Sequence, residues 1–143
     1  ADDCKFKKEE LSLHIHCPAT STPKDGPSAG GAICSAIYSL LTGRPILQNV
    51  AMTGEIDLIG NITAIGGVEA KLNGAKKAGI TLALIPKENE QQLERIRREG
   101  KSPESDDFKV IMVDHVKEAL KYVIQENWFN IYYCWIIYSI WTI

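Results

Sequence analysis

The sequence predicts a single domain of the α+β (mixed α/β) class, because segments with the pattern of strands alternate with segments with the pattern of helices. Its length of 143 residues is that of one domain built around one hydrophobic core. No internal repeat divides the chain. The chain is therefore expected to fold as one mixed unit rather than as a repeat array.

The first predicted element is a strand. From Leu11 to Cys17 apolar and polar residues alternate, and Pro18 ends the run. His14 and His16 stand two positions apart, so both side chains point to the same face. They could form a metal-binding pair or lie exposed on an edge strand. The exposed pair is favoured, because no third ligand follows at the spacing of a metal site.

A helix follows. The uncharged run from Ala32 to Leu41 predicts a buried helix that ends at Thr42-Gly43 and carries Ser28 in its first turn. Backbone N–H groups in that turn have no partner inside the helix, and the helix dipole adds positive charge. The amides of Ser28 and Ala29 could therefore hold an oxyanion beside the Ser28 hydroxyl. The simpler alternative is that Ser28 only caps the helix.

The central segment predicts a strand, a hairpin and a second helix. Gln48–Glu55 has the pattern of a strand buried through Val50 and Met52. Residues 56–58 and 62–65 flank the turn Ile59-Gly60-Asn61, which predicts a β-hairpin. Apolar residues at helical spacing then predict a helix that starts near Gly67 and stops at Gly79; they are Val68, Leu72, Ala75 and Ala78.

Strands and helices alternate again in the last third of the chain. Thr81–Pro86 predicts a buried strand, Glu88–Arg98 a charged helix with Leu93 and Ile96 facing inward, and Glu99–Asp107 a polar loop. The pattern predicts the last strand over Phe108–Val113. Asp114 is expected to cap a final helix from His115 to about Gln125.

Charge and cysteine content bear on the class of function. The net charge is −2, with charges of both signs scattered along the chain, so no basic stripe for nucleic acid is present. The cysteines form no C-x-x-C pair and no zinc pattern, which predicts neither a disulfide framework nor a metal site; they are Cys4, Cys17, Cys34 and Cys134. This usage is typical of a reducing, intracellular compartment. Ala1–Lys8 lacks the apolar core of a secretory signal.

The end of the sequence differs in composition from the rest. Trp128–Ile143 contains no charged residue and holds all three tryptophans. It is shorter than the ~20 apolar residues of a membrane-crossing helix, so a membrane span is not expected. It could cover an apolar patch, anchor the chain at an interface, or be a run fused to the domain by an unusual gene end, which its composition favours. We expect a domain over residues 1–127 and a tail over 128–143.

Lys71 is the second catalytic candidate. It lies about one turn into the predicted helix that starts near Gly67, among apolar residues and glycines. Desolvation and the positive end of the helix both disfavour its charged form, so both lower its pKa towards neutrality. Such an amine could act as general base for a serine hydroxyl. Lys76 and Lys77, further along the helix, are interpreted as solvated.

Three motifs in order resemble one family. The segments Pro23-Lys24-Asp25-Gly26-Pro27-Ser28-Ala29-Gly30, Ala51-Met52-Thr53-Gly54-Glu55-Ile56 and Ile65-Gly66-Gly67-Val68-Glu69-Ala70-Lys71-Leu72 resemble the proteolytic domain of the Lon family of ATP-dependent Ser-Lys proteases. The likeness extends from about Leu11 to Asn127. It implies the mixed fold of that domain, related to the ribosomal protein S5 domain 2-like class.

The resemblance also implies roles for single residues. Ser28 would be the nucleophile and Lys71 the general base of a Ser-Lys dyad. The hydroxyl of Thr53 would orient the lysine, and Asp25 would pair with the lysine in a resting state. His16 and Glu55 match positions whose role is supportive at most.

The sequence departs from the family pattern in places. Ala19-Thr20-Ser21 stands where the family usually has Glu-Gly-Ala, in a loop of the same length, and Gly31 and Val68 are mild substitutions. The family's proteolytic domain begins well upstream of Ala1, and no Walker A sequence, G-x-x-x-x-G-K-[ST], occurs in the chain. We therefore expect no cofactor or metal in this chain, and ATP to act in the family through a separate AAA+ module.

Two classes of function remain at this point. The first is an endopeptidase that cleaves unfolded or damaged polypeptides in the cytoplasm or mitochondrial matrix, assembled as the hexameric ring of the family, without nucleic acid or membrane partners. The second is a non-catalytic assembly or regulatory module, or an inactive fragment. The presence of both Ser28 and Lys71 favours the endopeptidase, because a binding module needs neither.

Overall fold

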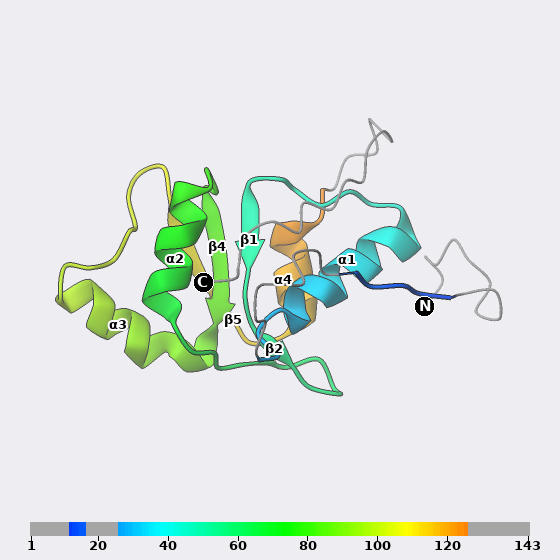
Figure 1. Ribbon diagram of the computed structural model, residues 1–143, viewed down its shortest axis with the longest axis horizontal. Helices are drawn as coiled ribbons and strands as arrows, with labels where there is room; N and C mark the ends of the chain where they lie inside the picture. Colours follow the sequence, from blue (N-terminus) through cyan, green and yellow to red (C-terminus); the bar gives the residue numbers. More distant parts are fainter. Residues whose placement is uncertain (1–11, 17–25, 126–143) are drawn as a thin grey trace.

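The computed structural model describes residues 12–16 and 26–125. Its elements in chain order are α1 (Gly30–Thr42), β1 (Val50–Met52), β2 (Glu55–Ile56), β3 (Ile62–Thr63), α2 (Val68–Lys77), β4 (Leu82–Pro86), the 3-10 helix η2 (Lys87–Asn89), α3 (Glu90–Arg98), β5 (Lys109–Val113) and α4 (Val116–Val123) (Figure 1). The predicted tail over residues 128–143, Asp25, and three of the four cysteines lie outside the described residues.

The described elements form a mixed α+β fold, as expected from the alternating pattern. Strands β1, β4 and β5 form a parallel sheet in the order β1-β4-β5, and β2 pairs with β3 as a separate antiparallel hairpin. Helices α2 and α3 lie on one side of the parallel sheet, and α1 and α4 on the other (Figure 1). This gives three layers, with the sheet in the middle.

Each face of the sheet has its own apolar cluster. Successive side chains of β4 point to opposite faces, so Ala83 and Ile85 pack with α2 and α3 while Leu84 packs on the α4 side. Phe108 joins the first cluster and is 1% exposed. The core is therefore continuous through the buried strand β4 rather than confined to one face.

Several predicted elements are confirmed closely. Helix α2 and strand β4 lie within two residues of their expected limits, and Leu93 and Ile96 of α3 are buried as predicted. Helix α1 ends at Thr42, and Gly43 adopts the left-handed conformation with φ 67°. A residue with a β-carbon is strained in that conformation, which is why glycine marks this helix end.

The predicted strand over Gln48–Glu55 is wrong in one respect, because it is two strands separated at Thr53 and Gly54. A β-carbon on Gly54 would stand 2.3 Å from Ile62 Cγ2, so only glycine lets the chain bend here against the hairpin. The hairpin itself is confirmed, with shorter strands than predicted. The carboxylate of Asp57 accepts hydrogen bonds from the Ile59 and Asn61 N–H groups within the turn.

The predicted first strand is not formed in the part of it that the structure describes. Residues 12–16 belong to no strand and all five are exposed. The rings of His14 and His16 stack with centroids 6.4 Å apart, consistent with a pair on one exposed face. Period-2 alternation describes side-chain pattern only, and a strand also needs a neighbour that pairs with its backbone.

Helix α1 is not the buried apolar helix that its composition predicts, because it buries a different set of residues. Its buried residues are Gly31, Ser35, Ser39 and Thr42, whereas its large apolar residues are half-buried or exposed. The three inward hydroxyls donate to backbone carbonyls of the helix and its C-terminal turn. The helix also begins at Gly30, so Ser28 precedes it rather than standing in its first turn.

The last helix is shorter and differently capped than predicted. His115, not Asp114, is the N-cap, and its Nδ1 accepts a hydrogen bond from the Lys117 N–H. The helix ends at Val123 because Ile124 leaves it to form a bridge with Ile46. Among the described residues no helix is long and apolar enough to cross a membrane.

Candidate active site

Ser28 lies in the turn that leads into α1. The Gly30 N–H donates to the Pro27 carbonyl at 2.9 Å, and Ala29 occupies the N-cap with no side-chain cap. Ser28 is half-buried. Its hydroxyl therefore does not perform the capping role that was the simpler alternative.

The backbone of Ser28 is held by the link between β1 and β2. Its carbonyl accepts hydrogen bonds from the Gly54 N–H at 2.8 Å and from Thr53 Oγ1 at 3.3 Å. The Gly54 carbonyl in turn accepts from the Gly31 N–H at 3.0 Å. Three hydrogen bonds thus fix the turn that carries the hydroxyl.

Glycines allow α1 to approach this link so closely. A β-carbon on Gly30 would stand 3.1 Å from the Ile56 backbone nitrogen and 2.9 Å from its Cγ2. A β-carbon on Gly31 would stand 2.4 Å from Met52 Cε. Any larger residue at Gly30 would push the start of α1 away from β2, because the obstacle includes backbone.

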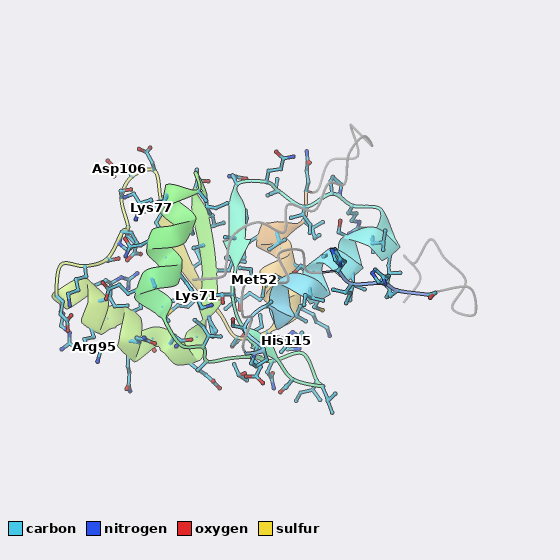
Figure 2. All side chains as sticks on the ribbon, in the orientation of Figure 1. Met52, Lys71, Lys77, Arg95, Asp106 and His115 are labelled. Atoms are coloured by element: carbon cyan, nitrogen blue, oxygen red, sulfur yellow. The ribbon has the colours of Figure 1, made fainter. Side chains whose placement is uncertain are left out.

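Lys71 stands on α2 (Figure 2), and its side chain reaches Ser28. It lies in the first turn of that helix, where its N–H donates to the Gly67 carbonyl at 3.0 Å, and Gly67 has φ 67°. Lys71 Nζ donates to Ser28 Oγ at 3.2 Å across 43 residues of sequence. The two predicted catalytic groups are therefore brought together by the fold.

The surroundings of Lys71 shift its titration towards the neutral amine. Partial burial lowers the pKa of Lys71 below its ordinary value of 10.5, because desolvation destabilises the ammonium form. A neutral amine has a lone pair, so the same contact can run in the opposite direction with the Ser28 hydroxyl as donor. The pair is thereby suited to proton transfer.

Backbone donors also converge on this turn. The Gly30 and Gly31 N–H groups are engaged by Pro27 and Gly54. Within the described part of the chain, the N–H groups of Ser28 and Ala29 donate to no backbone carbonyl. These are the two amides that the sequence nominates for an oxyanion, and they precede the positive end of α1.

The supporting residues have different positions. Thr53 is 3% exposed, and its hydroxyl donates to the Ser28 carbonyl, so its contact is with the backbone of Ser28. Glu55 is exposed at the start of β2, and His16 is exposed and stacked on His14. Asp25 lies outside the described residues.

Lys76 is exposed, as expected, and its ammonium group also binds a neighbouring loop. Its Nζ donates to the Pro103 carbonyl at 2.6 Å and to Ser105 Oγ at 3.0 Å, which ties the loop after α3 to α2. Lys77 is exposed, at the opposite end of α2 from Lys71 (Figure 2). Only Lys71 of these three lysines points to the site.

Sequence reasoning missed Gly54. Its N–H and carbonyl groups bridge Ser28 and Gly31, and the only signal was its place between Thr53 and Glu55 in a motif interpreted for its side chains. Among residues 12–16 and 26–125 no group of three His, Cys, Asp or Glu residues could hold a metal ion. Burial raises the pKa of the Cys34 thiol on α1.

Comparison with known proteins adds an independent finding. Residues 1–126 match the family model described as the Lon protease (S16) C-terminal proteolytic domain. The Lon protease of Vibrio parahaemolyticus is 46% identical over 121 residues, which are 83% of this chain and 15% of that protein. The Lon protease of Buchnera aphidicola is 52% identical over 99 residues, 67% of this chain and 13% of that protein. The chain thus spans about 15% of the length of such curated relatives.

Proposed function

Because the chain belongs to the Lon protease family through its C-terminal proteolytic domain, we propose that it hydrolyses peptide bonds with Ser28 as nucleophile and Lys71 as general base. The observation that carries the proposal is the contact of 3.2 Å between Lys71 Nζ and Ser28 Oγ. A nucleophile within hydrogen-bond reach of its base is the arrangement that covalent catalysis needs.

The proposed reaction has two halves. Neutral Lys71 takes the proton from Ser28 Oγ as the oxygen bonds to the scissile carbonyl carbon, and the amides of Ser28 and Ala29 stabilise the oxyanion. The intermediate collapses, the carbon–nitrogen bond breaks, and the Lys71 ammonium gives its proton to the leaving amine. A water molecule, deprotonated by Lys71, then attacks the acyl ester, and Ser28 regains its proton as the acid product leaves.

The electrostatics support the same assignment. The lowered pKa of Lys71 increases the fraction of neutral amine at physiological pH. Thr53 and Gly54 hold the Ser28 carbonyl, so the nucleophile needs little reorganisation before attack. Under this proposal Thr53 is a positioning residue.

The wider setting is part of the proposal. The substrates are unfolded or damaged polypeptides, and the chains assemble as a homo-oligomeric ring. The resemblance to the family implies both. ATP acts through a separate AAA+ module, since these 143 residues contain no Walker A loop. The proposed compartment is the cytoplasm or the mitochondrial matrix.

A cleavage assay with matched variants tests the proposal. Ser28→Ala and Lys71→Ala should each lower the rate of cleavage of an unstructured fluorogenic peptide by at least about 1,000-fold. Lys77→Ala is the control, because it removes an exposed amine from the same helix. Appreciable cleavage by Lys71→Ala would exclude the dyad. Binding of the peptide without any cleavage by the unaltered chain would favour the non-catalytic module.

A further inference from the structure

The side chain of Asn89 binds the backbone of a distant segment. Asn89 is 5% exposed and stands at the junction of η2 and α3. Its Oδ1 accepts a hydrogen bond from the Ile65 N–H at 3.0 Å, and its Nδ2 donates to the Ile65 carbonyl at 2.9 Å. Nδ2 also donates to Gln92 Oε1 at 3.1 Å. Both polar atoms of this buried amide are thus satisfied, chiefly by one residue of backbone.

Asn89 occupies a position at which its side chain would normally serve α3 itself. It is the N-cap of α3, where an asparagine side chain typically accepts a hydrogen bond from an N–H of the first helical turn. Here the side chain makes no such bond, and the amide binds Ile65 instead. This use of a capping residue points to a role outside α3.

The segment that Asn89 holds leads directly into α2. Glu88 adds a third hydrogen bond, because its carboxylate accepts from the Ala64 N–H at 2.7 Å. The Ile65 side chain is 9% exposed and packs in the same apolar cluster as Val68, the first residue of α2. Residues 64 and 65 are therefore held to η2 by their backbone and to the core by the Ile65 side chain.

Two glycines separate Ile65 from α2. Gly67 has φ 67°, and a β-carbon on either Gly66 or Gly67 would meet no atom within 4 Å. Because glycine backbone is conformationally permissive, the direction in which α2 starts depends on how Ile65 is held. The Gly67 carbonyl accepts from the Lys71 N–H at 3.0 Å. A shift of Ile65 would therefore move the helical turn that carries Lys71.

The apolar contacts of α2 do not replace this restraint. Val68 and Leu72 are fully buried and keep the helix on the sheet, but hydrophobic burial has no directional preference. Lys71 Nζ lies 3.2 Å from Ser28 Oγ, and a misplacement of about 1 Å between reacting groups can lower a rate about 100-fold. Directional hydrogen bonds at the start of α2 supply the precision that this contact needs.

We propose that Asn89 is a positioning residue for Lys71, because its two hydrogen bonds to the Ile65 backbone fix the start of α2 and so keep Lys71 Nζ within reach of Ser28 Oγ. The effect on cleavage rests on the proposed function, in which Lys71 is the general base. The effect on the place of the Lys71 amine does not, because it depends on these hydrogen bonds alone.

Peptide cleavage by the full chain with Asn89→Ala is the first measurement. We expect kcat to fall at least about tenfold while KM changes less than about twofold, because the base is displaced and the peptide-binding surface is not. Gln92→Ala is the matched control, because it leaves both bonds to Ile65 intact. Ile96→Val is the control for stability, because it removes one buried methylene from the same apolar cluster. Both controls should keep kcat within about twofold of the unaltered chain.

Titration of Lys71 by ¹³C NMR is the second measurement, and it needs no cleavage. The Lys71→Arg chain identifies the resonance. Loss of the restraint exposes the amine to water, so the pKa of Lys71 should rise towards its ordinary value of 10.5 in Asn89→Ala and stay unchanged in both controls. If the unaltered chain cleaves no peptide, the proposed function fails, and the titration alone decides the role of Asn89.

Two results would overturn the proposal. The first is an unchanged titration of Lys71 in Asn89→Ala, whatever the rate of cleavage. The second is an active unaltered chain in which Asn89→Ala lowers kcat no further than Ile96→Val does, because loss of stability would then explain the effect. Circular dichroism checks that each variant is folded. Asn89→Ser, whose one short hydroxyl cannot make both bonds, takes the place of Asn89→Ala in both measurements if that variant is unfolded.

Discussion

Ser28 and Lys71 meet because two glycine-dependent turns aim them at each other. Gly67 adopts φ 67° at the start of α2, and Gly54 holds the Ser28 carbonyl from the opposite side. The sequence could nominate both residues, by local pattern and by family resemblance. It could not supply their distance, because a contact across 43 positions depends on packing between elements.

The pH dependence of cleavage follows from the lowered pKa of Lys71. The base form is neutral, so kcat/KM should rise with pH through the pKa of Lys71, with a midpoint below 10.5. The stability of the fold should change in the same direction. Between the lowered pKa of Lys71 in the folded state and its ordinary pKa, the unfolded chain binds more protons, so stability rises with pH. A fluorogenic peptide without titratable groups gives the profile. A midpoint at or above the ordinary lysine value would contradict the assignment of Lys71 as base.

Thr53 should matter through the Ser28 carbonyl. Thr53→Val removes a hydroxyl that donates to that carbonyl at 3.3 Å in a buried position, while the Gly54 N–H still satisfies the oxygen. One such hydrogen bond contributes about 1 kcal/mol, so we expect kcat to fall roughly fivefold with KM little changed. Thr53→Ser keeps the hydroxyl and is the control. If Thr53→Val cleaved at the rate of the unaltered chain, the positioning role would be lost.

Among the helices and strands, hydrophobic periodicity correctly predicted the ones whose environment is local or fully buried. Helix α2, strand β4 and the inward residues of α3 are of this kind. The break at Thr53–Gly54 depends on a non-local partner, Ile62. Residues 12–16 form no strand, because a strand needs a second strand that pairs with it. Helix α1 shows a third limit, because its apolar composition predicted burial and its hydroxyl residues are inside.

Replacing two glycines by alanine should have opposite effects on stability. Gly30 lies where α1 closely approaches β2, whereas Gly74 has open space around it. Gly30→Ala places a β-carbon against the Ile56 backbone, and such overpacking costs about 1–3 kcal/mol. Gly74→Ala, in the interior of α2, meets no atom within 4 Å and should gain up to about 1 kcal/mol from helix propensity. Thermal denaturation measures both. An increase in melting temperature for Gly30→Ala would contradict the packing described here.

At the scale of the molecule, the site lies where three layers meet. Thr53 follows the carboxyl end of β1, and the starts of α1 and α2 come from opposite sides of the parallel sheet. Ligands of open parallel sheets bind beyond the carboxyl ends of the strands. The position of Ser28 and Lys71 follows that rule, although sequence patterns alone could not place both helix starts at one edge.

Degradation of folded substrates tests the chain as a whole. Without a nucleotide-binding loop in these 143 residues, unfolding of a substrate cannot be coupled to ATP hydrolysis. We expect slow cleavage of an intrinsically disordered protein, no loss of a stably folded one, and no response of either to ATP. Gel analysis over time with Ser28→Ala as control measures this. Loss of the folded protein upon addition of ATP would contradict the expectation.

The link at Thr53 and Gly54 also couples the stability of the site to the stability of the sheet. The Thr53 N–H donates to the Leu84 carbonyl of β4 at 3.0 Å, while Gly54 binds Ser28 and Gly31. The turn cannot loosen without pulling on the central strand of the core. In amide hydrogen–deuterium exchange, Gly31, Thr53 and Gly54 should therefore exchange at the slow rate of β4, and heat should abolish cleavage and secondary structure at one temperature.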